Sequence, residues 1–293
     1  MKVTCGVRNA GDVAGTHKVT MAKSRKVKRK SKITKSDYAA FVKIGVWLDT
    51  IQEHLQKEQY DEALTLCKRV VSHRKATRVQ KADAYGYMGN AYGMQQEFDL
   101  AYEANHLAIK YEPSNWIHYF NCGLSASYQM RLGHALRDYE KAVELCDDST
   151  MLGEVETREA DTKRMVEDEC ALRGADFTVD DLIAQRNLFD EGMMFLRQRD
   201  GASAIERFKM ALAMGEDCLP QPHFNIGSGY AMLGDWDSAE AAWKHALELD
   251  EEYEPAQKNL AMLPFLRDGM PFEGEVNSMK GQVENISMKV LKV

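Results

Sequence analysis

Residues 82–113 read ADAYGYMGNAYGMQQEFDLAYEANHLAIKYEP, and residues 116–149 read WIHYFNCGLSASYQMRLGHALRDYEKAVELCDDS. The second stretch repeats the small residues of the first at an offset of 34 positions. The matching pairs are Gly89 and Gly123, Ala101 and Ala135, and Ala108 and Ala142. A full set of small residues that recurs at one offset predicts an internal repeat with that period.

Small residues at this spacing are what two crossing helices require. Where the two helices of one unit cross, only Gly or Ala lets their backbones approach, and larger neighbours fill the remaining space. The units must then stack, because one unit cannot bury its apolar face alone. The pattern resembles the tetratricopeptide repeat (TPR) family, whose unit is a helix–turn–helix of 34 residues. This resemblance implies an all-α solenoid wound as a right-handed superhelix.

The resemblance extends over about residues 44–263 and predicts about five repeats. A first block is expected at 37–149, with units at 44–77, 82–115 and 116–149. A second block is expected at 185–266, with units at 185–219 and 220–253 followed by a capping helix that covers the last apolar face.

The first block contains two further expectations about helix ends. Ser36 or Asp37 can cap the first helix, whose apolar residues recur at steps of three and four from Phe41 to Leu55. Four extra residues separate the first unit from the second, and we expect residues 78–81 to lengthen the connection between them.

Residues 150–184 fill one repeat length without matching the repeat. Ten of the sixteen residues at 154–169 are charged, which favours one long, solvated linking helix over a degenerate repeat. Gly174 is expected to end this helix. Thr178, with Asp181 three residues later, forms an acidic capping box and predicts the start of the next helix.

The composition limits the class of protein. A hydrophobic fraction of 44% in 293 residues is enough for a sizeable core, in one large domain or two. No apolar run has the length of a membrane span, and no secretory signal is expected. The six cysteines form no C-x-x-C pair, so we expect a reducing, cytoplasmic setting, with a nuclear location as the alternative in a eukaryote.

The formal charge of −7 is unevenly distributed. Residues 1–36 carry eleven Lys or Arg and one Asp, whereas the remainder has 27 basic and 44 acidic residues. We expect the basic arm at 1–36 to be disordered. Three roles stay open for it: a solvated tail, an anchor for nucleic acid or an anionic membrane, and a nuclear address.

The C-terminal tail at 267–293 has one further pattern. Its apolar residues follow steps of three and four: Val276, Met279, Val283, Ile286, Val290 and Val293. This seam is heptad-like but too short to establish a coiled coil, and a short strand or disorder is an alternative.

The TPR resemblance implies a concave groove, lined by the first helix of each unit, that holds an extended peptide or a partner helix. Aromatic and Met side chains suit apolar anchors, and Asn can pair with a peptide amide in both directions. The alternative for each Asn is a bond within the array. The family positions place these residues at the groove: Tyr87, Asn90, Met94, Phe120, Asn121, Leu124, Tyr128, Phe189, Met193, Arg197, Phe224, Asn225 and Met232.

One TPR subclass holds the C-termini of chaperones in a clamp for two carboxylates. Asn90 and Asn121 match the two asparagines of this clamp. Its cationic positions fall on Gly86, Met151 and Val155, and none of these carries a charge. Co-chaperone activity of that kind is therefore not expected.

We expect no catalytic constellation, no cofactor and no metal ion. The sequence contains no G-x-S-x-G, no phosphate-binding glycine loop and no H-E-x-x-H. His118 and Cys122 lie four residues apart and could share a metal, but two ligands fall short of the usual four, and Cys122 occupies a core position.

The sequence therefore predicts a non-enzymatic TPR scaffold whose partner is another protein. The alternative is a nucleic-acid-associated regulator, in which the basic arm binds phosphate groups and the repeats recognise a partner.

Overall fold

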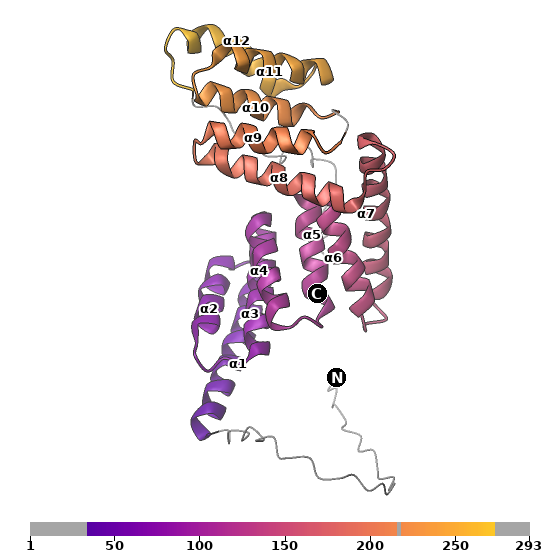
Figure 1. Cartoon of the computed structure of the whole chain (residues 1–293). Helices are drawn as coiled ribbons and strands as arrows, with labels where there is room; N and C mark the ends of the chain where they lie inside the picture. The colour runs from indigo at the N-terminus through magenta and orange to yellow at the C-terminus, as the bar shows by residue number, and fades with distance from the viewer. Residues whose placement is uncertain (1–33, 216–217, 273–293) are drawn as a thin grey trace, which may run out of the picture.

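The computed structural model describes residues 34–215 and 218–272, and every regular element within them is an α-helix. Figure 1 shows the helices stacked in chain order along an elongated molecule. The expected all-α solenoid is confirmed. The elements are α1 (Lys35–Gln56), α2 (Tyr60–Ser72), α3 (Arg78–Met94), α4 (Phe98–Tyr111), α5 (Trp116–Tyr128), α6 (Leu132–Leu145), α7 (Leu152–Arg173), α8 (Val179–Arg197), α9 (Gly201–Leu212), α10 (Pro220–Met232), α11 (Trp236–Leu249) and α12 (Glu254–Arg267).

Five antiparallel pairs account for ten of these helices: α1/α2, α3/α4, α5/α6, α8/α9 and α10/α11. In four pairs, a glycine of the first helix lies against a large side chain of the second. These contacts join Gly89 to Asn105, Gly123 to Tyr139, Gly192 to Phe208 and Gly227 to Trp243. A β-carbon at any of these glycines would meet the facing side chain at 2.3–2.6 Å, so the repeated small residue is a steric requirement.

Two helix starts differ from the sequence prediction. Thr34 caps α1 in place of Ser36 or Asp37, because its hydroxyl accepts from the Asp37 amide while the Asp37 carboxylate accepts from the Thr34 amide. Residues 78–81 form the first turn of α3 and do not lengthen the connection. Thr77 and Gln80 make the capping box that starts this helix early.

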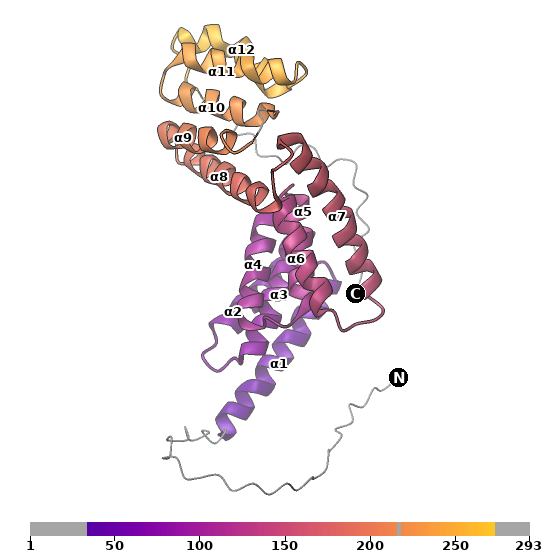
Figure 2. The ribbon, with the colours of Figure 1, turned by 45° about the vertical axis from the view of Figure 1, so that its right-hand side comes forward.

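Helix α7 lies between the third and fourth pairs and belongs to neither. It packs on α6, and it is followed by Gly174 at a φ of 129°. Thr178 and Asp181 then form the capping box that begins α8. In Figures 1 and 2 the helices change direction here: α1–α6 run along the molecule and α8–α12 run across it. We call α1–α6 the first block and α8–α12 the second block.

The two blocks meet where α8 packs against α6. Gly133 permits this approach, since a β-carbon there would lie 2.7 Å from Ile183. Charged groups surround the contact: Arg131 Nε lies 3.3 Å from an Asp190 carboxylate oxygen, and Arg186 Nε donates to the other oxygen at 2.9 Å. The Arg131–Asp190 ion pair joins α8 to the first block, and Arg186 holds the same carboxylate from within α8.

The second block ends in a covered apolar face. Helix α12 caps α11, and Phe272 reaches back to lie beside Trp243, with ring centroids 6.1 Å apart. Arg199 donates to the Phe272 carbonyl at 3.2 Å, which ties this segment to the turn between α8 and α9. A cover of this kind is what the last unit of a stacked array requires.

Some sequence predictions fall outside the described residues. These are the basic arm, apart from its last residues, and the heptad-like seam of the tail. None of the described helices combines the length and the hydropathy that a membrane span requires. The described cysteines are free thiols.

Candidate functional site

The first helices of the three pairs in the first block lie side by side and share one surface. Contacts join α1 to α3 and α3 to α5. Hydrogen bonds cross the same two boundaries: Gln52 Nε2 donates to the Tyr87 hydroxyl, and Asn121 Nδ2 donates to Asn90 Oδ1 at 3.1 Å. We call the surface marked by Gln52, Tyr87, Asn90 and Asn121 the ladder face.

The asparagine pair is the polar centre of the ladder face. Asn90 is exposed and Asn121 is half-buried. Their mutual bond uses one group of each carboxamide, so the Asn90 amide Nδ2 and the Asn121 carbonyl Oδ1 have no partner among the described residues. Whichever way the two carboxamides are oriented, one donor and one acceptor remain. The bond within the array that was the alternative interpretation is therefore present, and each Asn also keeps a free polar group.

Apolar side chains flank the asparagine pair. Met94, one turn beyond Asn90 on α3, is 45% exposed. Leu124 is half-buried on α5, and the Tyr128 ring stacks on Phe98 with centroids 4.6 Å apart. These side chains offer a place for an apolar group next to the free amide groups.

Negative charge lies at the Tyr87 end of the ladder face. The pKa of Tyr87 is raised, first by burial and then by the Asp83 carboxylate, with a smaller contribution from Asp49. Burial, together with the neighbouring Glu112, raises the pKa of Asp83 itself to about 6. A cationic group bound here would stabilise the charged form of Asp83.

Five residues predicted at the groove lie in the core instead. They are Phe120, Phe189, Met193, Phe224 and Asn225, each 7% exposed or less. Two of them pack on the side chain that covers a glycine. Phe120 turns toward the Tyr139 ring, which covers Gly123, and Phe189 packs on Phe208, which covers Gly192. These side chains are used in packing and are not part of the ladder face.

The last two predicted residues lie in the second block. Met232 is half-buried and packs against the core beside Phe224. Arg197 is exposed in the last turn of α8. The structure therefore does not bring the second-block residues into one surface with those of the first block.

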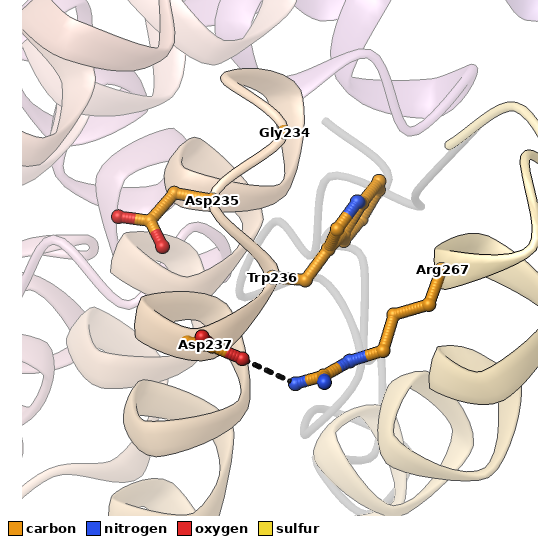
Figure 3. A pocket seen from close by; sticks show the side chains of 5 residues that line it. All are labelled: Gly234, Asp235, Trp236, Asp237 and Arg267. Atoms are coloured by element: carbon orange, nitrogen blue, oxygen red, sulfur yellow. Dashed lines mark hydrogen bonds and ion pairs between the residues drawn. The ribbon is translucent and has the colours of Figure 1, made fainter.

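A small hollow opens between α11 and α12 (Figure 3). Gly234, Asp235, Trp236, Asp237 and Arg267 line it, and Arg267 Nη2 lies 2.7 Å from the Asp237 carboxylate. Its volume of about 200 Å³ is below the roughly 300–1,000 Å³ of small-molecule pockets. The ion pair fastens α12 to α11, which is a structural role.

The two residues that could have shared a metal on α5 are used separately. His118 is buried, with Nε2 3.7 Å from the Glu112 carboxylate, and its ring lies against Gly86. Cys122 is fully buried and points toward α4, where its thiol lies 3.9 Å from the Tyr102 carbonyl oxygen. This pair does not form a metal site.

One comparison with known proteins agrees with the pairing of α10 and α11. Residues 220–253, which contain α10 and α11, match the family model of the tetratricopeptide repeat. A search of curated protein sequences finds no match.

Solved structures of TPR proteins superpose on the chain with low sequence identity. The TPR domain of P58(IPK) is 17% identical with a TM-score of 0.43, over 77% of this chain and 66% of that domain. The TPR2AB domain of yeast Sti1, in complex with pHSP90, is 14% identical with a TM-score of 0.37, over 76% and 84%. TTC0263, a TPR protein of Thermus thermophilus, is 16% identical with a TM-score of 0.30, over 76% and 99%.

Proposed function

We propose that this tetratricopeptide repeat protein, a protein–protein interaction scaffold, binds an extended segment of a partner protein on the ladder face. The observation that carries the proposal is the Asn90–Asn121 pair, which spans α3 and α5 and keeps one free donor and one free acceptor. A peptide backbone in extended conformation presents an acceptor and a donor at each residue, and two preorganised amide groups can bind both.

The side chains around the asparagine pair suggest which side chains a bound segment would carry. Exposed Met94 accepts an apolar side chain on one side of the asparagines. On the other side, Asp83 and Asp49 favour Lys or Arg. The expected ligand therefore carries a cationic residue and an apolar residue that flank the bound backbone. The acidic body of the chain would also increase the association rate of such a segment.

The test begins with peptides of random sequence displayed on phage and selected on the full chain. Selected sequences should be enriched in Lys or Arg at a fixed distance from an apolar residue. Synthetic peptides from this pool are then titrated calorimetrically against the wild type and Asn90→Ala. Loss of one amide hydrogen bond costs about 1 kcal/mol, so Asn90→Ala should weaken binding roughly fivefold.

The matched control is Lys141→Ala. Lys141 lies on α6, the second helix of the third pair, and forms an ion pair with Glu144. This variant should bind as the wild type does. Equal affinities for all three proteins, with unchanged melting curves, would place the binding site away from the ladder face.

A further inference from the structure

A second cluster of functional side chains lies between α4, α5 and α6, away from the ladder face. His106 comes from α4, Cys122 from α5 and Asp138 from α6. One ring nitrogen, the sulfur and a carboxylate oxygen all lie within 4.8 Å of one another. These three atoms come from two successive repeats, so only the stacking of the repeats brings them together.

The three donors differ in their access to solvent. Cys122 is fully buried and Asp138 is 9% exposed, whereas His106 is exposed at the outer side of the cluster. Tyr102 lies next to two of the donors: its ring lies edge-on to the His106 ring, with centroids 4.4 Å apart, and its hydroxyl opposes the rise in the pKa of Asp138. The second carboxylate oxygen of Asp138, Oδ2, is buried and has no hydrogen-bond partner among the described residues.

A buried carboxylate oxygen without a partner is costly, and apolar packing would not select Asp at this position. The neighbouring cation does not remove the cost. Arg131 lies over the Tyr102 ring at 4.9 Å, but its Nε is directed to Asp190 on α8 at 3.3 Å. The cluster therefore presents an unsatisfied acceptor next to a thiol and an imidazole.

We propose that His106, Cys122 and Asp138 bind a divalent transition-metal ion, with Zn²⁺ as the best fit. Imidazole nitrogen, thiolate sulfur and carboxylate oxygen are the three donor types of zinc sites, and three protein ligands leave a fourth position for water. Donor atoms around tetrahedral zinc lie roughly 3.5 Å apart, as follows from its bond lengths. The three donor atoms lie within 4.8 Å of one another, so their side chains must rotate toward the metal on binding, and the exposed His106 side supplies the entry path.

Metal binding would change the protonation of the cluster. Burial raises the pKa of the Cys122 thiol far above its usual value and that of Asp138 to about 7, while it lowers the pKa of His106. The charge of Arg131 further lowers the pKa of His106 and opposes the rise in the pKa of Asp138. On binding, the thiol proton and the proton of any protonated Asp138 are released to solvent, and the metal takes their place on sulfur and oxygen. His106 coordinates in the neutral form that its surroundings favour.

The test uses the full chain, stripped with EDTA and titrated with Co²⁺ and then with Zn²⁺. Wild type should bind one equivalent of Co²⁺ with the near-ultraviolet charge-transfer band of a cobalt–thiolate bond, and Zn²⁺ should displace it. Zn²⁺ should also raise the melting temperature, because the ligands join three helices that separate on unfolding.

The informative variant is His106→Gln, since His106 is exposed and its removal leaves the core intact. It should melt like the metal-free wild type, lose about tenfold or more in Zn²⁺ affinity and lose the thermal shift. The control is His54→Gln, a half-buried histidine on α1 that bonds Gln59 and lies outside the cluster. His54→Gln should behave as the wild type does.

Two results would overturn the proposal. One is the absence of a cobalt–thiolate band in the folded wild type. The other is equal Zn²⁺ affinity and thermal shift for His106→Gln and His54→Gln, which would mean that only adventitious surface binding occurs. Neither result depends on the ladder face, so this site and the proposed peptide site succeed or fail separately.

Discussion

Gly89 of α3 lies directly against the side-chain amide of Asn105 in α4, so that a β-carbon at Gly89 would be 2.3 Å from Asn105 Nδ2. Asn105 is 1% exposed, and the same Nδ2 donates to the Ala101 carbonyl at 2.9 Å. The amide therefore cannot move aside without breaking a buried hydrogen bond. This contact sets the distance between the two helices of the second pair.

Gly89→Ala is expected to destabilise the protein by roughly 1–3 kcal/mol, because the added methyl group overpacks the crossing with Asn105. Gly93→Ala in the same helix is the control. No atom lies within 4 Å of a β-carbon there, so it should stabilise the helix by roughly 0.5–1 kcal/mol. Urea denaturation measures the free energy of unfolding of both variants. A midpoint for Gly89→Ala at or above the wild-type value would contradict the steric argument.

Gly201→Ala should be more damaging than Gly89→Ala. A β-carbon at Gly201 would lie 2.4 Å from the Gly229 carbonyl oxygen, which belongs to the backbone of α10 and cannot rotate away. The expected loss is about 3 kcal/mol or more in the free energy of unfolding. Gly153→Ala, in the first turn of α7 with open space around it, is the matched control. Similar midpoints for the two variants would show that α9 and α10 are free to separate.

Arg173 is the residue expected to hold α7 in place. Its side chain is buried, Nη1 donates to Glu169 at 2.6 Å, and Nε donates to Gln185 Oε1 of α8 at 2.7 Å. Gln185 in turn donates to the Ala211 carbonyl of α9 at 3.0 Å. Arg173→Met removes the guanidinium and takes away the partner that Glu169 and Gln185 share.

We expect Arg173→Met to cost about 2–3 kcal/mol and to increase hydrogen exchange in the last turns of α7. Arg164→Met on the same helix is the comparison, because that side chain is 72% exposed and its ion pair contributes little. Equal exchange rates in the two variants would mean that α7 is held by its apolar side alone.

The junction of the two blocks should lose stability in mild acid. Burial, with the positive charge of Arg131, lowers the pKa of His134 to about 4, while Asp190 and Asn187 oppose the shift and Arg186 adds to it. The unfolded histidine titrates near 6.5, so between about pH 6.5 and 4 only the unfolded state binds this proton. The free energy of unfolding should therefore fall as the pH falls through this range.

His134 is partly exposed, which reduces the expected loss to the order of 1 kcal/mol. Replacing it with Gln should flatten that part of the pH profile, which thermal melts at a series of pH values would record. A His134→Gln profile parallel to that of the wild type would assign the acid sensitivity to other groups.

The sequence predicted the fold because its repeat is made of steric requirements. Gly89 and Gly123 mark helix crossings where an added β-carbon would clash, and the alanines that follow them are fully buried. Helix ends were harder to predict, because several neighbouring residues can make the same cap. Thr34 caps α1 in place of Ser36 or Asp37, and Thr77 starts α3 where a longer loop was expected. Each threonine forms a capping box with the side chain three residues later.

The candidate sites were less predictable, for a different physical reason. An aromatic side chain at a groove position can face outward or fill the space beside a glycine, and Phe120 and Phe189 fill it. The sequence pairs His118 with Cys122 because they are one helical turn apart. The structure pairs Cys122 with His106 and Asp138, which approach only when successive units stack.

The order of the helices in space is their order in the chain, and this matters while the protein is being made. The main contacts between the described helices join elements no more than two places apart, so each helix meets its neighbours soon after it is synthesised. The three pairs of the first block can close before α7 exists, and α8 then adds to a surface that is already formed. Assembly of this kind needs no distant helix, and it favours rapid folding during translation.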